Sequence, residues 1–506
     1  MQTIHIRNLA FVVLLAAAAF MACGGQKNDT PPPLAAVEAP LPETASPYDV
    51  LPESVRLALD KPFTGDFDAM VERRLIRVAV TFNRTHYFVD EGQQRGMAYE
   101  ALKSFEDDLN AQTKTGHLKV NVVFVPLPRD QLFPALLNGK VDLVAAMLTV
   151  TPERQAVVAF SEPTRTDVSE VVVTGPGAPQ MATVDDLAGK EVFVRKTSAY
   201  YSSLVRLNEQ LKERGKPAVV LRAAPEVLED DDLLEMVNAG LVPIIVVDDY
   251  LAEFWSQVFT NLNVHRDIAV RSGGSLAVAV RKENPKLREV VNTWIRKHGQ
   301  GDAFRNTVER RYLKSVKYAK NAASEAERRK FEAMVDLFRK YGSQYDIDYL
   351  LMAAQGYQES TLDQDAKSHV GAIGVMQIMP ATGKELDVGD ITQLEPNIQG
   401  GVKYMRFMMD HYFADEPMDD LNKGLMTFAA YNAGPGRLRK LRREAEERGL
   451  DPNVWFGNVE RVASERIGRE TVQYVSNIFK YYVAYRLIVD RRDQRDAAKA
   501  DIGKSP

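Results

Sequence analysis

The chain has 506 residues, which is too long for one hydrophobic core of ordinary size and predicts about three domains of roughly 100 to 200 residues each. A hydrophobic share of 45% and a charged share of 26% are typical of globular domains, and they exclude a chain that is disordered throughout or that crosses a membrane many times. With 64 Lys and Arg against 69 Asp and Glu, the formal net charge is −5, so no general attraction for phosphates exists and nucleic-acid binding is not expected.

The first 22 residues have the layout of a signal peptide. His5 and Arg7 precede an apolar run over residues 9–22, which ends at Cys23. The run is too short to span a bilayer comfortably and nothing comparable follows it, so the mature protein is expected to have no transmembrane helix.

Cys23 is the only cysteine, which excludes an intrachain disulfide. Its position at the end of the apolar run, after Ala22, resembles a bacterial lipoprotein signal, although Phe20 and Met21 depart from the usual residues. The resemblance implies that Cys23 is lipidated, and Gly24 after it favours an outer-membrane lipoprotein that faces the periplasm. Cleavage without lipidation and an uncleaved anchor are the alternatives.

The next segment, residues 23–67, is predicted to be a tether. Between residues 26 and 48 it carries six prolines among small and polar residues, a composition typical of extended linkers. A tether behind a lipid anchor implies that the rest of the chain lies in the periplasm.

From Leu75 onward, short β-branched runs alternate with amphipathic stretches, a pattern typical of an α/β domain with a largely parallel sheet. The expected strands are residues 76–80, 120–125, 141–147, 171–173 and 192–194.

Three segments of this region are more specific. LTVTPERQAVVAFSEP lies within residues 133–163, VDDLAGKEVFVRKTSAYY spans 184–201, and GSLAVAVRKENP spans 274–285. They resemble the family 3 periplasmic solute-binding proteins, which bind polar amino acids between two lobes. The resemblance implies a two-lobed α/β periplasmic-binding-protein domain over residues 68–314, with an amino acid or a muropeptide as its ligand.

The same resemblance implies that Arg154 binds the carboxylate of the ligand and that Thr149 stands in the preceding loop. A planar guanidinium binds a carboxylate with two hydrogen bonds, so this role suits the side chain. The alternative for Arg154 is an ordinary ion pair with Glu153 or Glu162.

In the second lobe, Asp248 ends the run IIVVD and is implied to bind the ammonium group of the ligand, with Ser198 as a further contact. Residues 196–198 replace the glycine-containing turn of the family, which leaves the identity of the ligand open. Asp248 is equally well explained as a turn residue next to Asp249.

Residues 315–330 are rich in Lys, Ala, Ser and Glu, and are expected to form a helical or flexible connector. Beyond them the apolar spacing is helical, which predicts a mainly α domain. The predicted organisation is a signal peptide at 1–22, the tether at 23–67, the solute-binding domain at 68–314, the connector at 315–330, the helical domain at 331–488 and a charged tail at 489–506.

Glu359 is the candidate catalytic residue of the helical domain. Asp346 or Asp348 can cap a helix that is expected to run to about Ser360, which places Glu359 near the helix C-terminus. The negative end of the helix dipole and desolvation both raise the pKa of a carboxyl group, as a general acid requires. An isolated glutamate would be better explained as an exposed helix-end residue.

Four motifs argue for the catalytic interpretation. They are QES at residues 358–360, GAIGVMQIMPATG at 371–383, AAYNAGPGR at 429–437 and ETVQYV at 470–475. In content and order they resemble the lytic transglycosylase family, and the resemblance covers about residues 331–485. It implies a lysozyme-like helical fold and an enzyme that acts on peptidoglycan glycan strands.

The resemblance also implies the chemistry. Glu359 would protonate the oxygen of the β-1,4 bond between N-acetylmuramic acid and N-acetylglucosamine, and would then deprotonate the muramyl C6 hydroxyl, which closes a 1,6-anhydro ring. The acetamido group of the substrate replaces a second carboxylate, and Asp363 and Asp365 are interpreted as solvated loop residues. The implied substrate-binding residues are Ser360, Met376, Gln377, Tyr431, Asn432 and Tyr474.

The reaction needs no cofactor, and the scattered histidines indicate no metal site. Two other functions stay open, namely a peptidoglycan-binding receptor with an inactive site and a muramidase that hydrolyses the same bond with water. Ligand binding between the lobes could also regulate the enzyme if closure of the lobes changes access to its active site.

Overall fold

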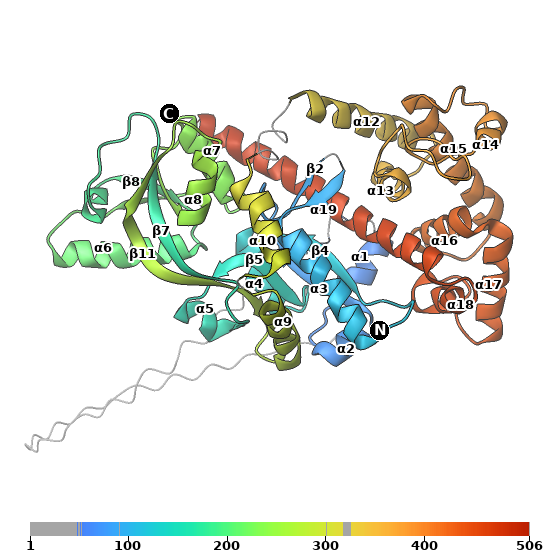
Figure 1. Cartoon of the computed structure of the whole chain (residues 1–506), viewed down its shortest axis with the longest axis horizontal. Coiled ribbons are helices and arrows are strands. Elements are labelled where there is room, and N and C mark those ends of the chain that lie inside the picture. The colour runs from blue at the N-terminus through green and yellow to red at the C-terminus, as the bar shows by residue number, and fades with distance from the viewer. Residues whose placement is uncertain are drawn as a thin grey trace, which may run out of the picture. The chain divides into compact units, whose positions relative to one another are not determined.

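The computed structural model describes residues 48, 51, 53–90, 92–299, 301–316 and 325–504 (Figure 1). The predicted signal peptide and Cys23 lie outside the described residues, as do most of the tether and residues 317–324 of the connector. The signal-peptide, lipidation and extended-tether predictions therefore stay predictions.

The first region is α/β, as predicted. One mixed sheet runs in the order β4-β1-β5-β11-β7-β10-β8-β9, with β6 beside β11, and β2 and β3 form a separate hairpin. The strands are β1 (Leu75–Val80), β2 (Phe88–Asp90), β3 (Gln93–Arg95), β4 (Asn121–Pro126), β5 (Leu143–Thr149), β6 (Ala159–Phe160), β7 (Arg165–Thr174), β8 (Glu191–Val194), β9 (Val220–Ala223), β10 (Ile244–Asp248) and β11 (Asn263–Val280).

The expectation of a largely parallel sheet is only half right. The pairs of β1 with β4 and β5, and of β8 with β9 and β10, are parallel, but β7 and β11 pair antiparallel with each other and with their neighbours. These two long strands belong to both halves of the sheet, so the chain runs from the first half to the second along β7 and returns along β11. The short β-branched runs alone do not contain this information.

Two hydrophobic cores correspond to two lobes. The first lobe holds Ile76, Val78, Phe105 and Leu143, and the second lobe holds Val172, Leu204, Val246 and Trp255. The helices of this region are α2 (Phe67–Glu72), α3 (Met97–Thr113), η1 (Arg129–Gln131), α4 (Leu132–Leu137), α5 (Pro152–Val157), η2 (Val184–Leu187), α6 (Ala199–Glu213), α7 (Asp230–Asn238), α8 (Asp249–Ser256), α9 (Pro285–Lys297), α10 (Ala303–Glu309) and the π-helical turn η3 (Arg310–Lys314).

The last part of the predicted tether is structured. Helix α1 (Glu53–Leu59) buries Val55 and Leu59, and the Tyr48 hydroxyl donates to the carbonyl of Lys140 at 2.7 Å. Apolar residues spaced by four place one helix face against the folded body, so this segment packs instead of remaining extended.

The C-terminal region is helical, as predicted. Its core includes Phe338, Met352, Val375, Met405 and Trp455, all fully or almost fully buried. The elements are α12 (Glu325–Gln344), α13 (Tyr349–Ser360), α14 (Pro380–Glu385), α15 (Leu394–Phe413), α16 (Asp420–Ala433), α17 (Pro435–Glu447), the irregular turn η4 (Trp455–Val459), α18 (Glu460–Arg466) and α19 (Arg469–Lys504).

Helix α19 includes most of the segment expected as a charged tail, because residues 489–504 continue it without a break (Figure 1). Lys480 of α19 pairs at 2.6 Å with Glu106 of α3, and the Tyr485 hydroxyl donates to the carbonyl of Gly92 at 2.5 Å. Within the described ranges, no helix combines the length and the hydropathy needed to cross a bilayer.

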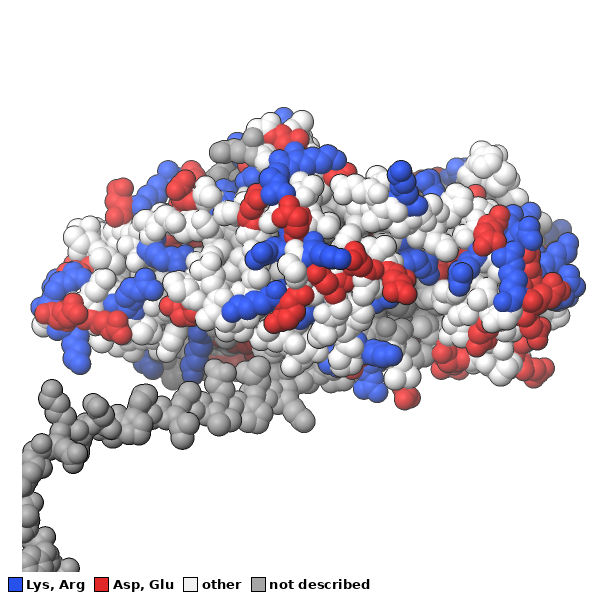
Figure 2. Space-filling model, turned by 90° about the horizontal axis from the view of Figure 1, so that it is seen from below, with Lys and Arg blue, Asp and Glu red and all other residues white. Residues whose placement is uncertain are grey.

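Basic and acidic side chains are interspersed over the face of the molecule seen in Figure 2. Several of them form exposed pairs, such as Lys286 with Asp68 and Arg266 with Glu253. Exposed pairs of this kind contribute little to stability, so the fold rests on its apolar cores and on buried polar contacts.

Candidate active site

Helix α13 positions Glu359. Asp348 caps this helix, since its carboxylate accepts a hydrogen bond from the backbone N–H of Leu350 at 2.9 Å. The helix ends at Thr361, whose φ of +57° takes the chain out of the helical path. The predicted helix and its cap are thus confirmed, and Glu359 lies in the last turn.

Tyr474 of α19 lies against Glu359. Its hydroxyl donates to the Glu359 carboxylate at 2.5 Å, and the Gln355 amide donates to the same hydroxyl at 3.4 Å. Burial raises the pKa of Glu359 to about 7, while the hydrogen bond from Tyr474 lowers it. The raised pKa places the carboxyl group where it can act as an acid near neutral pH.

The glycine-containing loop of residues 371–383 is fixed against α15. Gly374 has a φ of +76°, and a Cβ atom there would lie 2.5 Å from the Asn397 side chain, so the close approach requires glycine. Buried Asn397 in turn accepts from the N–H of Met376 and donates to the carbonyl of Ile373, both at 2.8 Å. The loop therefore has a defined shape beside α13.

Three predicted substrate-binding residues hold this loop in place. Ser360 donates to the carbonyl of Val375 at 2.9 Å, and the Gln377 amide donates to the carbonyl of Gly374 at 2.8 Å. The Met376 side chain is fully buried, and a Cβ atom on Gly401 would lie 2.5 Å from it. Their direct contact with a substrate stays a prediction.

Tyr431 and Asn432 lie at the end of α16. The Tyr431 hydroxyl donates to the carbonyl of Met376 at 2.7 Å, which ties α16 to the loop. Burial raises the pKa of Tyr431 well above its usual range, and the charge of Glu359 adds to that shift, so Glu359 and Tyr431 are electrostatic neighbours. The Asn432 side-chain oxygen accepts from the Thr471 hydroxyl at 2.6 Å.

Glu359, Asn432 and Tyr474 open into one cleft of about 620 Å³. Several residues that the sequence reasoning did not name also line it: Gln358, Arg469, Glu470, Gln473 and Asn477. The motif at residues 470–475 contains two of them, and Asn477 lies one helical turn beyond Gln473, to which it is hydrogen-bonded at 2.7 Å. Glu470 is thus a second carboxylate at the cleft, whereas Asp363 and Asp365 are exposed loop residues.

A second polar site lies between the two lobes. All four predicted ligand residues line it, namely Thr149, Arg154, Ser198 and Asp248. The space that they enclose measures about 20 Å³, close to the minimum that one water molecule needs. An amino acid would fit only after the side chains or the lobes move apart.

Arg154 joins the two lobes. Its guanidinium donates to the carbonyl of Thr149 at 2.9 Å and to the carbonyl of Thr197 at 3.0 Å. Glu162, considered as an ion-pair partner, pairs with Arg296. Burial lowers the pKa of Arg154 to about 10, and Arg129 nearby contributes to that shift.

Asp248 is buried, and its Oδ1 atom has no hydrogen-bond partner. Burial, and the charges of Asp230 and Glu170, raise the pKa of Asp248 well above its usual range. The Ser198 hydroxyl donates to the carbonyl of Arg195 at 2.7 Å and caps α6. Charged side chains thus surround the site, and Asp248 favours the protonated form in this closed arrangement.

Among the described residues, no group of three or more His, Cys, Asp or Glu side chains is arranged to hold a metal ion.

Two family models match separate parts of the chain. Residues 76–313 match the bacterial extracellular solute-binding proteins of family 3, and residues 336–453 match the transglycosylase SLT domain.

The chain is also similar to individual proteins and to solved structures. A membrane-bound lytic murein transglycosylase F from Pseudomonas fluorescens is 28% identical over 84% of this chain and 87% of its own length. The protein of the same name from Ectopseudomonas mendocina is 29% identical over 80% of this chain and 83% of its own. A substrate-binding protein of an amino acid ABC transporter is 23% identical, with a TM-score of 0.39, over 48% of this chain and all of its own.

Proposed function

The chain joins a family 3 solute-binding domain to a transglycosylase SLT domain, and from this premise we propose that it is a peptidoglycan lytic transglycosylase. It cleaves the bond between N-acetylmuramic acid and N-acetylglucosamine without water and leaves 1,6-anhydromuramyl ends. The observation that carries the proposal is the cleft in which the half-buried carboxyl group of Glu359, with its pKa raised to about 7, accepts a hydrogen bond from the Tyr474 hydroxyl.

The reaction then follows from proton movements at one carboxyl group. Protonated Glu359 gives its proton to the glycosidic oxygen as the bond from C1 to that oxygen breaks. The acetamido carbonyl of the substrate stabilises the positive charge at C1. The Glu359 carboxylate then takes the proton of the C6 hydroxyl, whose oxygen bonds to C1 and closes the ring.

Tyr474 is a positioning residue in this scheme. Its hydrogen bond holds one carboxylate oxygen of Glu359, which orients the other toward the cleft. Asn432 at the cleft wall offers an amide to an N-acetyl group.

Mass spectrometry of the soluble products from purified peptidoglycan tests the proposal. Anhydromuramyl products support it. Products with a reducing end, heavier by one water, would indicate a muramidase with Glu470 as a candidate second carboxylate. Absence of any product would favour a peptidoglycan-binding receptor.

The activity should depend on pH through Glu359. Because the acid must be protonated and its folded-state pKa is about 7, kcat/KM is expected to be high below pH 7 and to fall about tenfold per unit above it. Tyr474→Phe removes the hydrogen bond that lowers this pKa, so the midpoint should move to higher pH. Initial rates between pH 5 and 9 measure both effects, and a midpoint that is the same in both proteins would contradict the role of Tyr474.

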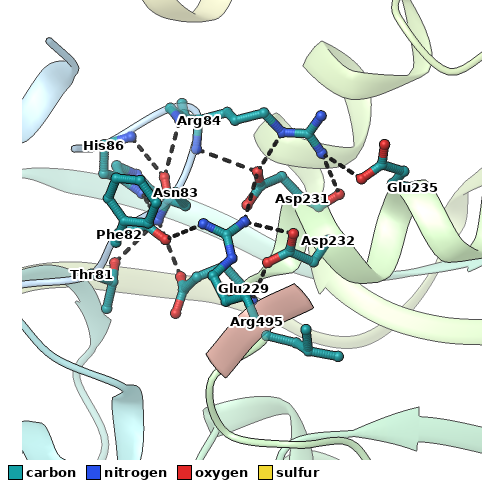
Figure 3. A network of polar contacts seen from close by, with 12 residues as sticks. Thr81, Phe82, Asn83, Arg84, His86, Glu229, Asp231, Asp232, Glu235 and Arg495 are labelled. Carbon is teal, nitrogen blue, oxygen red and sulfur yellow. Dashed lines mark hydrogen bonds and ion pairs between the residues drawn. The ribbon is translucent and has the colours of Figure 1, made fainter. Parts of the chain in front are cut away.

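The two domains of the chain also suggest regulation. We propose that a small polar ligand, such as an amino acid or a muropeptide, binds between the lobes and changes turnover at Glu359. In the closed arrangement, Arg84 pairs across the lobes with Asp231 at 2.9 Å (Figure 3). Arg129 likewise pairs with Glu229 at 2.8 Å. Because the space between the lobes is small, a ligand that enters it is expected to disrupt or rearrange these ion pairs.

Helix α19 offers the physical route from the lobes to the active site. It carries Tyr474 at one end, and near its other end Arg495 pairs with Asp232 of the second lobe at 2.6 Å (Figure 3). Lys499 pairs with the same carboxylate at 2.7 Å. A movement of α7, which contains Asp232, is therefore expected to move α19, whose Tyr474 is hydrogen-bonded to Glu359. Turnover on glycan strands that is unchanged by amino acids and muropeptides would contradict this coupling.

The names of the relatives include the word membrane-bound, which supports the interpretation that this chain is an envelope protein associated with a membrane. We propose that lipidated Cys23 supplies the attachment, at the outer membrane, on the basis of the sequence that precedes it. Mass spectrometry of the mature N-terminal peptide decides between a lipidated and an unmodified residue.

A further inference from the structure

Helix α15 carries a row of aromatic rings, Tyr404, Phe407 and His411, which we call the aromatic stripe. Residues spaced by three and four lie on one face of a helix, so these rings form one line along α15. A different face packs into the core through Ile398, Val402, Met405 and Met408. Tyr404 is partly buried against the same core, whereas Phe407 and His411 are exposed, so core packing does not explain the outer part of the stripe.

The rings of the stripe are nearly parallel. The centroids of Tyr404 and Phe407 lie 6.3 Å apart with planes at 14°, and those of Phe407 and His411 lie 5.3 Å apart at 11°. Tyr412 meets His411 edge-on at 4.7 Å. Centroid distances of this size with nearly parallel planes describe offset rings that share one orientation.

The stripe begins at the active site. Tyr404 lies edge-on to Tyr431, with ring centroids 5.6 Å apart. Tyr431 donates to the carbonyl of Met376 and is an electrostatic neighbour of Glu359. A line of ring contacts therefore leads from Tyr431 through Tyr404 to Phe407 and His411.

Phe407 is exposed and does not belong to a hydrophobic core of the described residues. Half of its surface is accessible, and among the described residues it is the only aromatic one in the set of exposed large hydrophobic side chains. The neighbouring positions Arg406 and Asp410 pair with each other along the helix, as solvent-facing residues usually do. Phe407 is thus an exposed ring flanked by a charged pair.

We propose that the aromatic stripe is a secondary binding surface for the glycan strand, on which sugar rings outside the cleavage site stack against Phe407 and its neighbours. The inference rests on the proposed function and extends it to residues outside the cleft. A sugar ring has a face of C–H groups that packs on an aromatic face, and its hydroxyl groups need polar partners at the rim. Arg406 and Asp410 supply such partners beside Phe407.

A glycan suits the stripe better than other occupants because Tyr404 contacts Tyr431, which is hydrogen-bonded to the loop beside the helix that carries Glu359. A flat membrane would be expected to require a wider apolar area, whereas the flanking side chains here are charged. The proposal therefore predicts that glycan binding depends on the aromatic ring of Phe407, and not only on the hydrophobic character of its side chain.

The test compares three forms of position 407 in the full chain, namely the wild-type Phe, Phe407→Leu, which keeps an apolar side chain but removes the ring, and Phe407→Trp, which keeps a ring. The control is Leu241→Ala, which changes a similarly exposed apolar residue far along the sequence in the second lobe. In a Glu359→Gln background, which removes the acid, binding to purified soluble glycan strands is measured directly. Phe407→Leu should weaken it about three- to tenfold, while Phe407→Trp and Leu241→Ala should not.

Activity provides the second readout. With Glu359 intact, Phe407→Leu should lower the ratio of kcat/KM on long strands to that on the shortest cleaved fragment. Equal glycan binding by the Leu and Phe proteins would overturn the proposal, as would a loss of binding to anionic lipid vesicles without a loss for glycans. Because binding is measured without turnover, an inactive wild type would refute the proposed enzyme and still leave the stripe tested.

Discussion

Glu359→Gln is expected to lower the release of anhydromuropeptides by about a hundredfold to ten-thousandfold, the range that general acid catalysis contributes. The amide preserves the size of the side chain and can still accept the hydrogen bond from Tyr474, so the fold of the cleft should persist. It has no acidic proton to give to the glycosidic oxygen. Turnover is measured by quantifying soluble products from purified peptidoglycan.

The matched control is Asp363→Asn, which neutralises an exposed carboxylate only four residues away. This variant should keep the wild-type rate, because Asp363 faces solvent and not the cleft. Wild-type rates in the Glu359→Gln protein would refute the assignment of Glu359 as the acid and would direct attention to Glu470, which lines the same cleft.

Asp232→Ala should lower the free energy of unfolding by about 3 to 5 kcal/mol, because it removes one partner from a buried charge network. The Asp232 side chain is fully buried, pairs with Arg495 and Lys499, and accepts a hydrogen bond from the N–H of Glu229 at 2.9 Å. Without the carboxylate, the guanidinium of Arg495 stays mostly buried without its closest charge partner, and α7 loses part of its N-terminal cap (Figure 3).

Urea unfolding followed by tryptophan fluorescence measures this loss, since Trp255 lies in the core of the second lobe. Glu253→Ala breaks an exposed pair with Arg266 and provides the control, with an expected cost below about 1 kcal/mol. If Asp232→Ala were as stable as this control, the contact between α19 and the second lobe would not hold the two together. The Asp232→Ala protein should also lose any response of turnover to ligands of the solute-binding domain.

Local sequence patterns were sufficient for much of the fold. Short β-branched runs located β1, β4 and β8, and the apolar spacing around Leu350, together with an aspartate before it, located α13 and its cap at Asp348. These features depend on neighbouring residues, which the sequence displays directly. The mixed pairing of β7 and β11 depends on how the chain crosses between lobes, and the predicted parallel sheet was wrong there.

For the candidate site, too, the sequence predicted some features and only the tertiary structure showed others. The motif around Glu359 and the tyrosine at 474 could be named from the sequence, but the hydrogen bond between them joins residues 115 positions apart, and only the tertiary structure places them together. The buried position of Met376 and the closed space between the lobes were equally invisible, because they depend on packing partners from distant segments.

Taken by itself, the sequence determined the two-domain organisation and the α/β and helical classes of the domains, and it predicted Glu359 as the acid, because periodicity and short motifs are local. Only the tertiary structure decided that the expected tail is part of α19, that this helix joins Tyr474 to the acidic end of α7, and that Tyr404 lies against Tyr431. These properties arise from long-range packing and from the burial of charge, which no local pattern in a single sequence records.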